Sequence, residues 1–68
     1  MSRDEQLIMI RAMKRFGGAF VRALGEAFLV ADERNADRLQ AAFPNYIETY
    51  GPGSAYFAYF AEMQREEA

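Results

Sequence analysis

The spacing of apolar residues in the first half of the chain is the feature that most limits its possible folds. Between Met9 and Val30 these residues recur at alternating steps of four and three, the spacing of one face of an α-helix. The stripe consists of Met9, Met13, Phe16, Phe20, Ala23, Ala27 and Val30. We therefore predict one long helix over residues 1–31, with Ser2 or Asp4 as its N-terminal cap.

A second apolar line runs beside the first and widens the face of this helix. It consists of Ile10, Gly17, Val21, Leu24 and Phe28, and so broad a face needs more cover than one short helix offers. Gly17, Gly18 and Gly25 lie in the same segment, although each costs about 1 kcal/mol relative to Ala in a helix. Because the apolar spacing continues through them, we favour close packing against another backbone as their role. A short loop at Gly17-Gly18 is the alternative.

The second half of the chain contains signals for shorter helices. Asp32 is a candidate cap for a helix that ends near Ala42, and Pro44 can open a short helical segment that ends at Gly51. A turn at 51–53 then leads to Ser54, the candidate cap of a last helix over 55–67. We predict a single all-α domain over 1–68, in which two or three shorter helices follow the long one as a helical hairpin or small bundle.

The small size of the chain predicts that it associates with itself. A 68-residue core rarely supplies more than about 3–5 kcal/mol, and proteins of this size usually add disulfides, a metal or further copies. The chain has no cysteine and no histidine, which excludes disulfides and the usual zinc site. It is nevertheless 51% hydrophobic and 15% aromatic. We expect a homo-oligomer.

Residues suited to catalysis are scarce. His and Cys are absent, and the two serines, Ser2 and Ser54, stand where helix caps are needed. No phosphate-binding glycine loop is present, because Gly17-Gly18 lacks the spacing and the lysine of such a motif. We expect a protein that is not an enzyme and has no cofactor or catalytic or metal-ligating residues. Without a signal peptide pattern or a long apolar run, a cytoplasmic location is expected, with no membrane association.

Charge is distributed unevenly although the net charge is only −2. Residues 1–31 carry five basic and three acidic side chains, whereas residues 32–68 carry three basic and seven acidic ones. This pattern is typical of ordinary helix surfaces. It also allows oppositely charged segments to pair, within one chain or between copies.

Two groups of residues are candidates for a ligand or partner site. The first is a basic face on the predicted long helix, formed by Arg11, Lys14, Arg15 and Arg22 around Gly18. Arginines beside small residues can bind phosphates or an acidic partner. The alternative is a solvated face in which Arg22 pairs with Glu26 one turn on.

The second group is aromatic and contains all four tyrosines of the chain, Tyr46, Tyr50, Tyr56 and Tyr59. With Phe43, Phe57 and Phe60 they crowd into a short stretch. We expect most of these rings in the core and the others in a self-association interface, where tyrosine is favoured. A ligand or partner site is the alternative, and stacking on nucleic acid bases is supported least.

Residues 20–28 and 39–50 resemble small helical proteins carried by bacteriophages and other mobile elements. The shared segment has the form Ala-Phe-Pro-x-Tyr, here Ala42-Phe43-Pro44-Asn45-Tyr46, and it follows a helix that ends near an Asp. The resemblance covers less than half of the chain and implies a phage or mobile-element origin. It implies no activity, and it assigns no functional residue.

These observations lead to three hypotheses about function. The first is a non-enzymatic, homo-oligomeric protein–protein interaction module, with interference with a host defence protein as a task suggested by the resemblance. The second is sequestration of a phosphate-containing small molecule, such as a host signalling nucleotide, by the arginines and tyrosines. The third is nucleic-acid binding through the basic face, against which the net charge of −2 argues.

Overall fold

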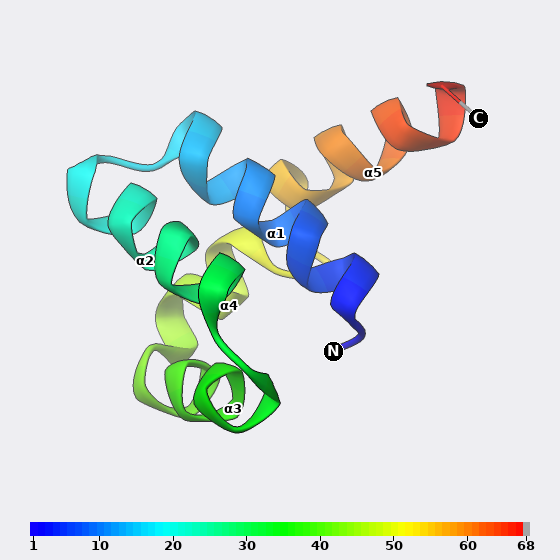
Figure 1. The fold of residues 1–68 in the computed structure, drawn as a ribbon. Coiled ribbons are helices and arrows are strands. Elements are labelled where there is room, and N and C mark those ends of the chain that lie inside the picture. The colour runs from blue at the N-terminus through cyan, green and yellow to red at the C-terminus, as the bar shows by residue number, and fades with distance from the viewer. Residues whose placement is uncertain (68) are drawn as a thin grey trace.

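Five α-helices make up the structure, a computed structural model that describes residues 1–67. They are α1 (Arg3–Phe16), α2 (Ala19–Val30), α3 (Glu33–Ala42), α4 (Pro44–Tyr50) and α5 (Ala55–Glu67). No strand occurs among the described residues, and the all-α fold class is confirmed. The helices form a small bundle in which α1 is central and contacts α2, α4 and α5, while α3 packs on α4 (Figure 1).

The prediction of one long N-terminal helix is wrong, because the chain leaves the helix at Gly17-Gly18. Both glycines have extended backbone, with φ −84° and ψ 160° at Gly17 and φ −77° and ψ −170° at Gly18. The chain then turns back, so that α2 lies along α1 (Figure 1). The alternative of a short loop is therefore confirmed. A broad apolar face on one continuous helix would lack cover, whereas a hairpin buries its two halves against each other.

The break also changes which apolar line is buried. In α1 the first stripe points inward, and Met9 and Met13 are fully buried. In α2 it is instead the second line that is buried, through Val21, Leu24 and Phe28. The continuation of the first stripe on α2 faces outward. Because Gly17 and Gly18 are not helical, the position of a residue around α2 cannot be counted from α1. The apolar spacing across the break therefore does not predict which side of α2 is buried.

The predicted helix caps are confirmed. Ser2 and Glu5 form a reciprocal capping box at α1, in which the Ser2 backbone N–H donates to the Glu5 carboxylate at 2.8 Å. Asp32 accepts from the Asn35 N–H at 2.8 Å at the start of α3, and the Ser54 hydroxyl accepts from the Phe57 N–H at 3.2 Å. Each cap satisfies a backbone N–H group that a helix start leaves without a partner.

Pro44 and Gly51 delimit α4 as predicted. Pro44 is the first residue of the helix, where its missing N–H costs nothing. Gly51 closes it, donating its N–H to the Ile47 carbonyl at 2.7 Å. The following turn contains Gly53 at φ 94°, a conformation that favours glycine. This turn brings the first residues of α5 back toward α4, so that Tyr50 and Phe60 enter the core together.

The predicted role of the glycines in close packing is not required at Gly25. This residue is buried in α2, and a Cβ there would lie 3.6 Å from the Ile10 carbonyl oxygen and 3.4 Å from the Met13 Cβ of α1. Both are ordinary van der Waals distances, so an alanine would fit at this position as well. Among the described residues, no helix is long and apolar enough to cross a membrane.

Candidate functional site

Three predicted basic residues line one surface hollow on α1. Arg11, Lys14 and Arg15 form its wall, and Phe60 from α5 completes it. The volume of this basic hollow is about 370 Å³. Lys14 and Arg15 follow Arg11 by three and four positions, which is one turn of α1. The three positive charges therefore lie close together at a single site.

Aromatic rings hold both arginines of the basic hollow. The Arg11 guanidinium carbon lies 4.8 Å from the centroid of the Phe60 ring, and that of Arg15 lies 5.6 Å from the Phe16 ring. Both distances are within the range of a cation–π interaction, about 6 Å. Stacking uses the flat face of a guanidinium and leaves its N–H groups directed outward in the ring plane. The arginines are therefore positioned and still able to donate hydrogen bonds.

A continuous series of aromatic contacts adjoins the basic hollow. The Tyr50 and Tyr56 rings stack at 5.4 Å, and the Tyr56 ring stacks on Phe16 at 4.6 Å. Tyr59 meets both Phe16 and Phe60 edge-on, at 5.6 and 5.1 Å. Tyr56 is 41% and Tyr59 53% exposed, whereas Tyr50 is buried. Two of the four tyrosines thus present ring surface to solvent beside the three cations.

The remaining predicted site residues lie elsewhere. Arg22 is an exposed residue of α2 and does not line the basic hollow. Gly18 is the N-cap residue of α2, and a Cβ there would meet nothing within 4 Å. Tyr46 packs on Phe20, with 5.8 Å between ring centroids. The prediction of one basic face that includes Arg22 is wrong, because the break at Gly17-Gly18 puts this residue on another helix.

The predicted Arg22–Glu26 pair is also replaced by a different one. The Glu26 carboxylate forms a salt bridge with Lys14 of α1, across the helical hairpin. Both side chains are about half exposed, which makes the stabilisation by this pair small, on the order of 0.2–1 kcal/mol. The salt bridge matters mainly because it restrains the Lys14 ammonium group at the basic hollow.

Phe16 and Phe60 are the functional candidates that sequence reasoning missed. The sequence places Phe16 in the apolar stripe and Phe60 in the aromatic group without a contact to any arginine, and Phe60 is buried in the structure. Each nevertheless supports an arginine from a helix surface. The spacing of four between Arg11 and Arg15 was visible in the sequence, but nothing in the sequence placed Phe60 opposite Arg11.

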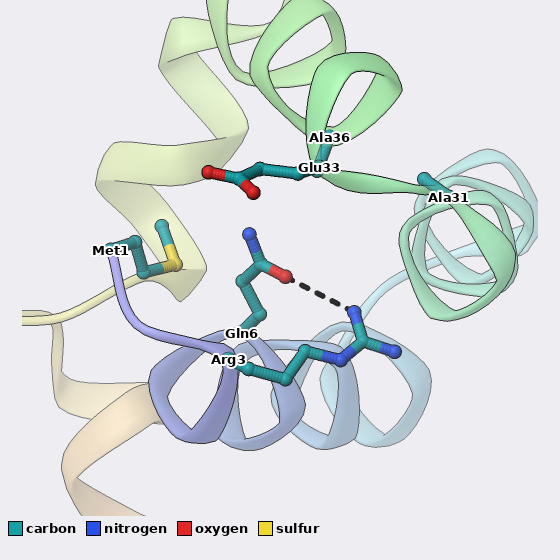
Figure 2. A pocket seen from close by; sticks show the side chains of 6 residues that line it. All are labelled: Met1, Arg3, Gln6, Ala31, Glu33 and Ala36. Carbon is teal, nitrogen blue, oxygen red and sulfur yellow. Dashed lines mark hydrogen bonds between the residues drawn. The ribbon is translucent and has the colours of Figure 1, made fainter.

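A second cavity, of about 500 Å³, lies between the start of α1 and the link from α2 to α3 (Figure 2). The Arg3 guanidinium donates to the Phe28 and Leu29 carbonyls at the end of α2, at 3.3 and 2.9 Å. It also donates to the Gln6 side-chain oxygen at 3.1 Å, and the Gln6 amide nitrogen points across the cavity toward Glu33 (Figure 2). The contacts of Arg3 satisfy carbonyls that a helix end leaves free. We therefore assign Arg3 a structural role. The distribution of charge along the sequence does not indicate this role.

The outward surface of α2 is a third feature, and it is apolar. Val30 is 81% and Phe20 55% exposed, and Ala19 and Ala23 are exposed as well. Phe20 is covered on one side by Phe43 and Tyr46 of the α4 region, with 5.8 Å between its ring centroid and each of theirs. We call Ala19, Ala23, Ala27 and Val30 the α2 face; Arg22 and Glu26 lie on its flank. Ala19, Ala23 and Val30 are exposed, and Ala27 is half-buried.

Comparison with known proteins identified no relative of the chain. No family model, no curated protein and no solved structure matches the chain.

Proposed function

We propose that this chain is a non-enzymatic binding protein that acts as a homo-oligomeric interaction module in the cytoplasm, with a second copy covering the α2 face. The observation that carries the proposal is the exposure of apolar residues along α2, the outermost of them Val30 at 81%. A soluble monomer gains nothing from an apolar helix surface at this position. A second copy would remove that surface from water.

The composition of the α2 face suits another helix. Ala19, Ala23 and Ala27 recur every four residues and form a ridge of small side chains. Small residues allow two helix axes to approach closely. A flat, small-residue surface of this kind favours a helix as its occupant over a loop or a small molecule.

Charge complementarity selects a second copy as that helix. Arg22 and Glu26 stand one turn apart on the same flank of the α2 face. If two copies of α2 pack antiparallel about a two-fold axis at the level of Leu24, Arg22 of each copy lies opposite Glu26 of the other. The Glu26 carboxylate then has two cationic partners, Arg22 of the other copy and Lys14 of its own chain. A two-fold interface is self-complementary, so one such contact is made twice. Because the helix has only 12 residues, we expect a small interface and micromolar association.

The small size of the domain supports the same conclusion. A core of this size yields few kcal/mol, and the chain, which has no cysteine, cannot add a disulfide. The resemblance of residues 20–28 and 39–50 to small bacteriophage proteins further suggests the task of the module. We propose that the assembled protein binds a host protein and interferes with its activity.

Self-association can be tested with two matched variants. Ala23→Lys places a charge in the centre of the α2 face, and Ala58→Lys places one at an exposed position of α5. Both positions are mid-helix alanines with an acidic residue three or four positions further on, Glu26 and Glu62. Light scattering after size exclusion, over protein concentrations up to the millimolar range, gives the molar mass, and circular dichroism verifies the fold.

We expect the native chain and Ala58→Lys to associate and Ala23→Lys to remain monomeric while keeping its helix content. A native chain that stays monomeric over the whole range contradicts the proposal. Equal loss of association in both variants would place the interface elsewhere than on α2.

A further inference from the structure

We propose that the basic hollow binds a small anion attached to a planar ring, of the nucleoside phosphate type. This inference goes beyond self-association and rests on other residues, Arg11, Lys14, Arg15 and the rings beside them. It assigns the phosphate to the cations and the planar ring to Tyr59 and Phe60.

Charge supports an anionic ligand. The chain has a net charge of −2, yet the basic hollow is walled by three cations. The one carboxylate in a salt bridge at this site is Glu26, which contacts Lys14; among the side chains of residues 1–65 none bridges Arg11 or Arg15. Arginine N–H groups pair two at a time with the oxygens of a phosphate or a carboxylate, and a phosphate offers the greater negative charge. A phosphate or diphosphate therefore matches the unused donors.

The positions of the two arginines reduce the entropy lost on binding. A free arginine side chain has many rotamers, and fixing them opposes association. Here Phe60 and Phe16 already hold the guanidinium groups, at 4.8 and 5.6 Å from the ring centroids. Lys14 is likewise restrained by Glu26 and has three N–H donors, so it can contact a phosphate while the salt bridge persists.

The exposed tyrosine ring provides the second part of the ligand chemistry. Tyr59 stands edge-on to Phe60, the residue that forms the floor of the basic hollow, and is 53% exposed. Part of the Tyr59 side chain is therefore accessible beside Phe60. A planar heterocycle can stack there while a phosphate attached to it reaches Arg11 and Arg15. The hollow is shallow, with a volume of about 370 Å³, so such a ligand would lie against the surface of α1 and Phe60 and stay partly exposed.

A polynucleotide is a poorer match than a small ligand. Binding to a strand draws on cations that follow the backbone over several nucleotides. The basic residue that would extend the hollow, Arg22, lies on α2 and does not line it. The basic surface is therefore restricted to one hollow.

The test is a titration of the ¹⁵N-labelled protein followed by NMR, with three probes. ADP contains both ring and phosphates, adenosine only the ring and pyrophosphate only the charge. We expect ADP to shift the Arg11 and Arg15 side-chain Nε–H signals and the Tyr59 ring signals. Adenosine and pyrophosphate are each expected to bind at least about tenfold more weakly than ADP.

Matched variants assign the effect to the basic hollow. Arg11→Gln and Arg15→Gln each remove one guanidinium from it, and each should weaken ADP binding about tenfold. Arg38→Gln removes an exposed arginine of α3 and should leave the affinity unchanged. Circular dichroism of each variant verifies that it is folded. If Arg11→Gln disturbs the packing of Phe60, Arg15→Gln still tests the site, because Arg15 is exposed and does not contact that ring.

Several results would overturn the inference. The absence of any shift at Arg11 and Arg15 with ADP refutes it, and equal weakening by Arg38→Gln reduces it to nonspecific charge attraction. Pyrophosphate that binds as tightly as ADP refutes the role of the rings. A single-stranded oligonucleotide that binds more tightly than ADP, with a steep dependence on salt, would show that the hollow belongs to a polynucleotide surface instead.

Discussion

Replacement of Gly17 by alanine distinguishes the helical hairpin from the continuous helix that the apolar spacing predicts. In a continuous helix, Gly17→Ala would increase stability by about 1 kcal/mol, because alanine has the higher helix propensity. In the hairpin, Gly17 is the residue at which α1 ends. A Cβ there would lie 2.6 Å from the Met13 carbonyl oxygen and would also overlap the Val21 side chain. The two architectures therefore predict effects of opposite sign.

The magnitude follows from what can move to relieve the overlap. The Met13 oxygen cannot withdraw easily, since it accepts the Gly17 N–H at 2.9 Å as the last bond of α1. Val21 is buried against the core, so displacing it disturbs packing between α1 and α2. Overpacking of this kind costs about 1–3 kcal/mol. For a domain of this size, each kcal/mol corresponds to a change in Tm of about 4–8 °C.

Gly18→Asp is the matched control at the neighbouring position. A Cβ at Gly18 meets nothing within 4 Å, and α2 has no side-chain cap there. The carboxylate of an aspartate can accept a hydrogen bond from a backbone N–H in the first turn of α2. An aspartate also has fewer backbone conformations than glycine in the unfolded chain. A gain of about 1 kcal/mol is expected.

Urea unfolding followed by circular dichroism, at one fixed protein concentration because association shifts apparent stability, measures both changes. We expect a loss for Gly17→Ala and a gain for Gly18→Asp. If Gly17→Ala is as stable as the native chain or more so, the close contact with Met13 and Val21 is absent and the hairpin assignment fails.

Two further predictions concern the start of α1. Arg3→Met removes the hydrogen bonds to the Phe28 and Leu29 carbonyls and should reduce stability by about 1 kcal/mol in thermal unfolding, whereas Arg34→Met, on the exposed side of α3, should not. Hydrogen bonds from the backbone and then the side chain of Ser2 lower the pKa of Glu5 from its ordinary value of 4.5. A lowered pKa of Glu5 in the folded state stabilises the fold at any pH above 4.5, and this stabilisation disappears as the pH falls through the lowered pKa. The difference in stability between the native chain and Glu5→Gln should therefore shrink on acidification. A difference that stays constant down to strongly acidic pH would contradict this role.

The structure brings together only some of the residues of the predicted basic face. The grouping of Arg11, Lys14 and Arg15 is confirmed, because residues three and four apart on one helix are neighbours whatever surrounds the helix. Arg22 was assigned to the same face by counting through Gly17-Gly18, and the break invalidates that count. Tyr59 lies beside the hollow, but Tyr46 and Tyr50 pack elsewhere, since aromatic density along the chain does not indicate which helix each ring meets.

The sequence alone determined the all-α class and most of the helix ends. Ser2, Asp32, Ser54, Pro44 and Gly51 act within one turn of themselves, through hydrogen bonds and backbone geometry that do not depend on the rest of the fold. The tertiary structure decided how the first 30 residues are divided and which side of α2 is buried. Those outcomes depend on the free energy of packing α2 against α1, which outweighs the weak local preference for continuing the helix through Gly17-Gly18. The same packing pairs Glu26 with Lys14, places Phe60 beneath Arg11 and leaves the α2 face open.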